Sequence, residues 1–211
     1  MGRNMKNTVE FFFDCSSPWT YLAFEGIQAS LVDIDIVWKP ILVGGIFNSV
    51  NPSVYVSREN PVSQKVSYHV KDLQDWASRR SVTIGKPKPF PVNSVKAMRG
   101  AFVAIEEGLL VEYARAIFRR YWTDLQDISS DSVLKSVTQE VGLETTDFFT
   151  KINLVQYKEK LRENTDELIS RQGYGSPTMF LNESEMFFGN DRIDMLMWRI
   201  SENKAKREDA L

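Results

Sequence analysis

The sequence predicts a soluble α/β protein in which a strand-helix-strand unit and a strand-strand-helix unit are separated by a long all-helical segment. An aromatic and β-branched run, Thr8–Phe13, indicates a buried strand, and a helical pattern and a second alternating stretch at 34–38 follow it. Strand patterning returns only at 177–181 and 185–188, ahead of a last amphipathic helix. Two short β-containing units at the two ends of the chain therefore share one sheet.

The turn after the first strand carries a helix start. Pro18 stands at a first helical position with Ser17 before it, which is typical of a capped helix N-terminus. A hydroxyl at that place lies at the positive end of a helix that leaves the carboxyl end of a strand, a position suited to an anion. The links are short and Lys39-Pro40 closes the second strand, so we expect the two strands to pair in parallel.

The segment from Ile41 to Asn60 is rich in Gly, Asn, Ser and Pro. We expect it to be a loop with no regular element of its own. It leaves the end of the second strand on the same side as Ser17, and long loops in compact domains are often functional. The sequence therefore predicts that this segment borders the site.

Helical periodicity dominates the middle of the chain. The first of these helices starts at Pro61 and is expected to place Val62, Val66, Val70, Leu73 and Trp76 on one apolar face. The others are predicted from a cap at Asn93 or Ser94 to Gly108, and at 110–122, 131–141, 146–149 and 156–171. The predicted organisation is a domain of residues 1–56 and 174–205 with a helical insertion domain of residues 57–173, and the charge run 204–209 is expected to be a solvated tail.

Composition narrows the class of function. A chain of 211 residues with 43% hydrophobic and 26% charged residues is typical of a globular protein, and a net charge of -2 argues against nucleic acid as a partner. No run of eighteen apolar residues and no signal-peptide core is found, so we expect a cytoplasmic protein without a membrane partner. The single histidine, His69, supports neither a catalytic triad nor a histidine metal site, and we expect no metal.

Strand, turn and an X-Pro-X-X box at a helix start form the place where thioredoxin-like proteins keep a Cys-X-X-Cys motif. Here the box reads Ser17-Pro18-Trp19-Thr20, with hydroxyls in place of the two thiols. The chain has one cysteine, Cys15, two residues before the box, and we expect it to be a small buried residue. Dithiol chemistry within the chain is therefore excluded.

Three stretches together resemble a known superfamily: Phe13-Asp14-Cys15-Ser16-Ser17-Pro18-Trp19-Thr20-Tyr21-Leu22, Gly173-Tyr174-Gly175-Ser176-Pro177-Thr178 and Phe188-Gly189-Asn190-Asp191-Arg192. They resemble the 2-hydroxychromene-2-carboxylate isomerases and the kappa-class glutathione transferases, and the resemblance runs from about residue 8 to 200. It implies a DsbA-like thioredoxin fold with a helical insertion, glutathione as the cofactor and a homodimer.

The resemblance also implies roles for single residues. Ser17 matches the serine that contacts the glutathione sulfur, Pro177 the cis-proline that faces it, and Ser176 the residue whose backbone pairs with the tripeptide. Asn190 and Asp191 match the pair that holds the γ-glutamyl end. The chemistry agrees, because a carboxylate binds an ammonium group and backbone N–H groups at a helix start bind a carboxylate.

A role for the Ser17 hydroxyl also follows from thiol chemistry. A free thiol has a pKa near 8.5 and is only a few per cent ionised at neutral pH. Each unit of depression corresponds to about 1.4 kcal/mol of preference for the thiolate, and a hydroxyl donor with a helix N-terminus can supply one or two such units. The alternative is that Ser17 is a plain helix cap, worth about 1 kcal/mol.

The sequence departs from the isomerases in the segment after the second strand. Several isomerases have a lysine there that meets the substrate carboxylate, and ungapped matching places Asn48 at that position. Asn51 is the counterpart of a family asparagine only with a shift of one residue, and Trp19 is the aromatic residue expected to touch an aromatic substrate.

The first function hypothesis is a glutathione-dependent isomerase of an aromatic or conjugated carbonyl compound, in which a bound thiolate adds and is eliminated again. The second is a kappa-class-like glutathione transferase or peroxidase, which consumes the same thiolate. The third is a non-catalytic binding or chaperone-like module on the same fold.

Overall fold

The computed structural model describes residues 7–30 and 34–208. The four strands are β1 Thr8–Phe13, β2 Asp35–Pro40, β3 Thr178–Leu181 and β4 Glu185–Phe188. The α-helices are α1 Pro18–Ser30, α2 Val43–Val50, α3 Ser53–Glu59, α4 Ser63–Arg79, α5 Val95–Glu106, α6 Leu110–Phe118, α7 Asp131–Val141, α8 Thr145–Lys151, α9 Val155–Ser170 and α10 Ile193–Glu208. A π-helical turn, Arg119–Thr123, extends α6, and a 3-10 turn, Asn190–Arg192, precedes α10.

The strands form one mixed sheet in the order β2-β1-β3-β4. β1 pairs in parallel with β2 and antiparallel with β3, which pairs antiparallel with β4. The predicted parallel pair and the predicted strand-strand-helix unit are both confirmed. Because β1 lies between β2 and β3, the turn that follows β1, which contains Ser17, begins at the end of an interior strand.

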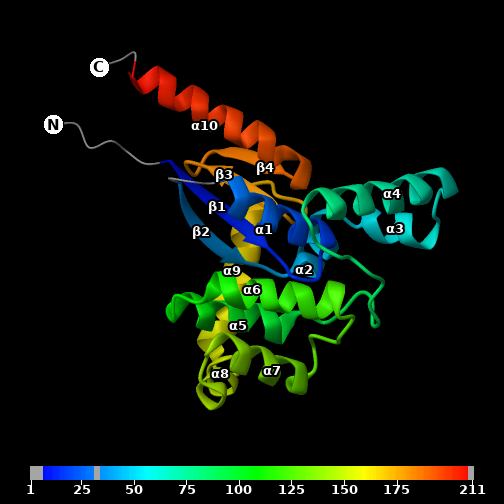
Figure 1. Cartoon of the computed structure of the whole chain (residues 1–211), viewed down its shortest axis with the longest axis vertical. Coiled ribbons are helices and arrows are strands. Elements are labelled where there is room, and N and C mark those ends of the chain that lie inside the picture. The colour runs from blue at the N-terminus through cyan, green and yellow to red at the C-terminus, as the bar shows by residue number, and fades with distance from the viewer. Residues whose placement is uncertain (1–6, 31–33, 209–211) are drawn as a thin grey trace.

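Side chains of β1 alternate between two buried faces. Phe11 and Phe13 belong to the larger core, which also contains residues of α1, α5, α6 and α10. Phe12 lies in a second, smaller core with Ile46 of α2 and Leu168 of α9. Helices therefore cover both faces of the sheet, with α1 and α9 on opposite sides of it (Figure 1).

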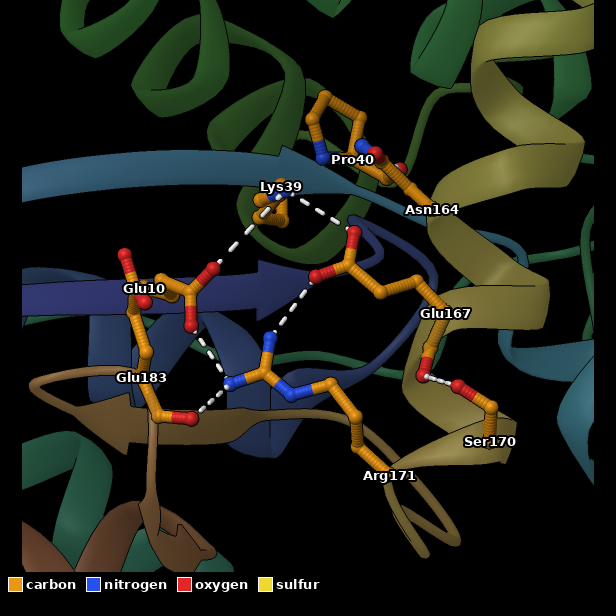
Figure 2. A network of polar contacts seen from close by, with 8 residues as sticks. All are labelled: Glu10, Lys39, Pro40, Asn164, Glu167, Ser170, Arg171 and Glu183. Atoms are coloured by element: carbon orange, nitrogen blue, oxygen red, sulfur yellow. Dashed lines mark hydrogen bonds and ion pairs between the residues drawn. The ribbon is translucent and has the colours of Figure 1, made fainter.

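The second face carries a charged network where α9 meets the sheet (Figure 2). The guanidinium of Arg171 donates to the carboxylates of Glu10 at 2.6 Å and Glu167 at 2.8 Å, and Lys39 donates to Glu167 at 3.0 Å. Arg171 also lies 3.7 Å from the ring centroid of Phe180. The network ties β1, β2 and the end of α9 to one another.

The segment 41–60, expected to be a loop, instead forms α2 and α3. Its polar composition conceals the fact that Ile46 is fully buried against Phe12. The N-terminus of α2 is satisfied from outside the segment, because the N–H of Leu42 donates to the Thr165 hydroxyl at 3.0 Å and that of Val43 to Asp14 at 2.9 Å. These tertiary partners stabilise α2, a helix that local composition disfavours.

The predicted apolar face of α4 is only partly buried. Leu73 and Trp76 pack against the main core, but Val62, Val66 and Val70 are 50%, 47% and 43% exposed. The reason is that α3 and α4 project from the body of the molecule (Figure 1), so only the second half of α4 reaches the core.

The other helices follow their predictions within a few residues. Gly142 ends α7 in the left-handed conformation with φ of 82°, as expected for a C-terminal glycine. The charge run 204–209 is not a tail throughout, because α10 continues to Glu208; residue 209, like Leu31 at the end of the first helical pattern, lies outside the described residues. In the described ranges 7–30 and 34–208, no helix has the length and apolar character needed to span a membrane.

Candidate active site

Ser17 is the N-terminal cap of α1 and also faces the segment before β3. Its Oγ accepts from the N–H of Thr20 at 3.3 Å and donates to the carbonyl oxygen of Ser176 at 3.2 Å. The cap interpretation of Ser17 is thus confirmed as geometry, and it is compatible with a second role. The hydroxyl hydrogen points across the gap between two segments that are 159 residues apart in the chain.

The peptide bond between Ser176 and Pro177 is cis, as the resemblance implied. The Ser176 hydroxyl lies 2.8 Å from the hydroxyl of Thr20 and accepts from the N–H of Asp14 at 3.0 Å. The carbonyl of Ser176 receives the Ser17 hydroxyl. Side chain and carbonyl of Ser176 are therefore both held by the first turn of α1 and the residues before it.

Asp14, three residues before Ser17 in the chain, is a buried carboxylate. It is 1% exposed and accepts from the N–H groups of Ser16 and Val43, both at 2.9 Å, and from the Ser94 hydroxyl at 3.1 Å. Burial raises the pKa of this carboxyl, and the hydrogen bonds oppose the shift. One side chain thus joins the end of β1 to the first residues of α2 and α5.

A cleft of about 920 Å³ opens beside Ser17. Its walls come from the start of α1, from α2 and α3, from the start of α4, and from the segments 90–95 and 174–176. Five other phenylalanine and tyrosine rings line it together with Trp19: Phe47, Tyr55, Phe90, Tyr174 and Phe188. The expectation that the segment 41–60 borders the site is confirmed, although as helices rather than as a loop.

A second cleft, of about 680 Å³, is lined by Pro177. It is lined by Asn190 and Asp191 at the start of the last helical unit and by Tyr68 and Asp72 of α4. Trp19, Tyr174, Ser176 and Phe188 line both clefts, so the two are neighbours that share one wall.

Asn190 is the most unusual polar residue of the second cleft. It is 2% exposed, and neither its amide nitrogen nor its carbonyl oxygen has a hydrogen-bond partner among the described residues. Gly189 before it has φ of 104°, and a Cβ there would lie 2.7 Å from Oδ1 of Asp191. A side chain at 189 would therefore displace Asp191, which explains the glycine.

The structure brings together most of the residues that the sequence singled out. Ser17, Trp19, Asn51 and Ser176 line the first cleft, and Trp19, Ser176, Pro177, Asn190 and Asp191 line the second. Asn51 donates to the carbonyl oxygen of Tyr174 at 3.0 Å. Asn48 is the exception: it lines neither cleft and instead accepts from the Tyr55 hydroxyl at 2.8 Å.

His69 and Cys15 are the other two residues that the sequence analysis discussed. His69 is exposed at the first cleft, with its ring 5.2 Å from that of Trp19 in an edge contact. Cys15 is 1% exposed, and burial raises the pKa of its thiol well above the ordinary value, which fits a packed residue. Within 7–30 and 34–208, no group of three or more His, Cys, Asp or Glu side chains is arranged to hold a metal ion.

Asp14 and Arg58 line the first cleft but were missed from the sequence. For Asp72, one turn from His69 on a helix, the sequence left open whether it faces the site or solvent, and it lines the second cleft. Asp14 stood inside the motif that identified the family, and only its burial and its three donors distinguish it.

Fold and site together define a thioredoxin-fold protein in which serine stands at the dithiol position. The chain matches the DSBA-like thioredoxin domain family over residues 8–201 and belongs to it.

Two proteins of similar sequence are enzymes by name. The chain is 29% identical over 199 residues to a 2-hydroxychromene-2-carboxylate isomerase of Pseudomonas putida, covering 89% of this chain and 91% of that protein. It is 27% identical over 212 residues to glutathione S-transferase kappa 1 of Rattus norvegicus, with 92% and 91% covered. A solved structure of a 2-hydroxychromene-2-carboxylate isomerase superposes with a TM-score of 0.80 at 25% identity, covering 97% of this chain and 99% of that one.

Proposed function

We propose that this protein is a glutathione-dependent isomerase of an aromatic or conjugated carbonyl compound. The observation that carries the proposal is the position of the Ser17 hydroxyl in the first cleft, where it caps α1 and donates at 3.2 Å to Ser176, a residue that lines both clefts. One cleft has the polar residues for a charged tripeptide and the other has aromatic walls for an apolar substrate.

The residues of the second cleft fit glutathione. Asn190 has two buried polar atoms without a partner in the described residues, and such atoms cost free energy until a ligand satisfies them. Asp191, and Asp72 across the cleft, supply carboxylates for the ammonium of the γ-glutamyl end. The backbone at Ser176, in the segment before β3, suits the extended peptide.

When bound, glutathione would supply a thiolate that adds to a conjugated double bond and leaves again, so that the bond can rotate or the ring can open. The part of this chain is to favour the ionised sulfur. Ser17 would redirect its hydroxyl hydrogen from Ser176 to the sulfur, while the N-terminus of α1 adds a positive potential. Ser17 then stabilises a nucleophile and does not itself become one.

The aromatic walls of the first cleft would orient the substrate. Trp19 lies at the boundary of the two clefts, where a planar ring held against it would meet the sulfur bound at Ser17. Phe47 and Phe90 extend the apolar surface away from that boundary.

The similarity to glutathione S-transferase kappa 1 favours a second candidate, transfer of glutathione to the substrate or peroxide reduction. Incubation with a conjugated ketone and glutathione separates the two. Isomerisation gives a product of unchanged mass and leaves the glutathione concentration constant. An adduct, or oxidised glutathione, that accumulates in proportion to substrate loss would overturn the isomerase proposal in favour of the second candidate.

The third hypothesis, a binding or chaperone-like module on the same fold, is tested by glutathione affinity. In that case Asp191→Ala would leave glutathione affinity unchanged, whereas the proposal expects a loss of about tenfold or more from removal of a charged hydrogen-bonding partner. Calorimetric titration of the wild type and of Asp191→Ala measures this difference directly.

A further inference from the structure

We propose that Thr20 is a positioning residue for glutathione. Its side-chain hydroxyl holds Ser176, and with it the segment before β3, in the place where the backbone of the tripeptide docks. This inference rests on the proposed function, which assigns the sulfur of glutathione to Ser17 and its peptide backbone to Ser176. It adds a residue that acts on the ligand only through its neighbour.

Thr20 is a buried residue next to the clefts. It is the fourth residue of the box Ser17-Pro18-Trp19-Thr20, where a Cys-X-X-Cys motif has its second thiol. Thr20 is 0% exposed and lines neither cleft. A ligand in either cleft is therefore not expected to contact it, and any effect of its side chain on binding must pass through a neighbouring residue.

Thr20 contacts both residues that the proposed function assigns to glutathione. Its backbone N–H donates to Oγ of Ser17 at 3.3 Å, and its hydroxyl lies 2.8 Å from the hydroxyl of Ser176. Ser17 in turn donates to the carbonyl oxygen of Ser176 at 3.2 Å. The three hydrogen bonds join the three residues in a closed ring, in which the main chain of Thr20 fixes Ser17 and its side chain fixes Ser176.

The side-chain contact of Thr20 becomes most important when a sulfur is bound. In the proposed function the Ser17 hydroxyl turns from the Ser176 carbonyl oxygen to the sulfur, so the ring opens at that bond. The hydroxyl of Ser176 still accepts from the N–H of Asp14 at 3.0 Å and still lies against Thr20. Thr20 therefore keeps the docking segment attached to α1 while Ser17 changes its partner.

Burial strengthens the contact between the two hydroxyl groups. Ser176 is 8% exposed and Thr20 is 0% exposed, so water does not readily replace either partner. A thiol at position 20 would form a weaker bond, because S–H is a weak donor and sulfur a weak acceptor. A hydroxyl at this position of the box is thus suited to fixing the docking segment.

Loss of the Thr20 hydroxyl is expected to allow the docking segment more than one arrangement. The apparent affinity of a ligand falls in proportion to the fraction of molecules that are competent to bind it, so a competent fraction of about one tenth weakens binding about tenfold. The effect concerns the peptide backbone of the ligand and not its sulfur. It is therefore expected to be equal for S-methylglutathione, which keeps the peptide but has no ionisable thiol.

The test measures the affinities of glutathione and S-methylglutathione by isothermal titration. Thr20→Val, which has a similar shape but no hydroxyl, is expected to bind both ligands about tenfold more weakly than the wild type does. Thr20→Ser restores a hydroxyl and is expected to bind both with nearly wild-type affinity. Ser176→Ala removes the other hydroxyl of the pair and is expected to resemble Thr20→Val, so it decides the question if Thr20→Val does not fold.

Thr138→Val is the matched control. Thr138 is also 0% exposed and its hydroxyl lies 2.9 Å from that of Thr145, yet neither residue lines a cleft. The control is expected to leave both affinities unchanged. The proposal is overturned if Thr20→Val binds both ligands as tightly as the wild type, if it weakens glutathione alone, if Thr20→Ser is as weak as Thr20→Val, or if Thr138→Val causes the same loss.

The wild-type titrations keep this result separate from the proposed function. A wild type that binds neither ligand overturns both proposals. A wild type that binds both ligands, with Thr20→Val binding them equally well, overturns the role of Thr20 alone and leaves the proposed function in place.

Discussion

The hydroxyl of Ser17 and the carbonyl oxygen of Ser176, 3.2 Å apart, connect the first turn of α1 to the segment before β3. The same hydroxyl accepts from Thr20 at 3.3 Å, so both its hydrogen and a lone pair are engaged. A sulfur bound between these segments would compete with the Ser176 carbonyl for one hydrogen. The strength of that competition sets how far the pKa of a bound thiol falls.

Replacing Ser17 with alanine removes the hydrogen-bond donor and is expected to return the pKa of bound glutathione toward 8.5, the value of a free thiol. The wild type is expected to hold that pKa about one unit lower. Ultraviolet thiolate absorbance across a pH titration measures both. Ser78→Ala, an exposed serine of α4, is the control. Identical titrations of the wild type and Ser17→Ala would contradict the role given to Ser17.

Ser17→Ala also removes the cap of α1 and is expected to lower the free energy of unfolding by about 1 kcal/mol without ligand. The physical reason is that the N–H of Thr20 loses its acceptor. Urea denaturation measures the change. A loss several times larger would show that Ser17 supports the fold beyond its cap.

Asn190→Leu is expected to stabilise the ligand-free protein and weaken glutathione binding. Both side-chain polar atoms of Asn190 are buried without a partner in the described part of the chain, so replacing them with apolar atoms of similar volume is expected to raise the free energy of unfolding by about 1 kcal/mol. Denaturant unfolding and calorimetric titration with glutathione measure the two effects. A destabilised variant that binds glutathione normally would contradict the assignment.

Asp14 is expected to make stability depend on pH. Burial raises its folded-state pKa above the ordinary 3.8, so the folded protein binds the proton more tightly than the unfolded chain does. The contribution of the protonated Asp14 carboxyl to the free energy of unfolding is fully present below pH 3.8. It is lost as pH rises through the folded-state pKa.

Unfolding free energies of the wild type and Asp14→Asn, measured in a pH series from 3.5 upward, check this expectation. The wild type is expected to lose stability relative to Asp14→Asn as pH rises across the window. Ser94→Ala removes one hydrogen bond to the same carboxylate without removing a titrating group, and its difference from the wild type tests the hydrogen bond alone. A pH-independent difference between wild type and Asp14→Asn would show that the carboxyl has the same pKa in both states.

Arg171→Met is expected to lower the free energy of unfolding by about 2 kcal/mol. Among the described residues, it leaves the carboxylate of Glu10, a residue 8% exposed, with Lys39 at 3.9 Å as its remaining cationic partner. The double variant Glu10→Leu with Arg171→Met is expected to recover part of that loss. Arg115→Met, which breaks the more exposed pair with Glu25, is expected to cost less than about 1 kcal/mol. Urea denaturation of all three tests the network of Figure 2.

The sequence by itself determined where the strands and most helices lie along the chain, because these positions depend on local patterns. Examples are the β1 run Thr8–Phe13, the Pro18 helix start and the glycine after α7. It also identified Ser17 in the first cleft, Pro177 in the second and Ser176 in both, since these residues stand in motifs that can be read without coordinates.

Only the tertiary structure decided which contacts form between segments that are distant in the chain. The helix α2 forms in a polar stretch because Ile46 contacts Phe12 and because Thr165 and Asp14 accept from the start of α2. The guanidinium of Arg58 lies over the rings of Phe47 and Phe90, which are 11 and 32 residues away in the chain. Burial and unsatisfied polar atoms are properties of packed surfaces, so no local pattern could reveal the buried carboxylate of Asp14 or the unpartnered amide of Asn190.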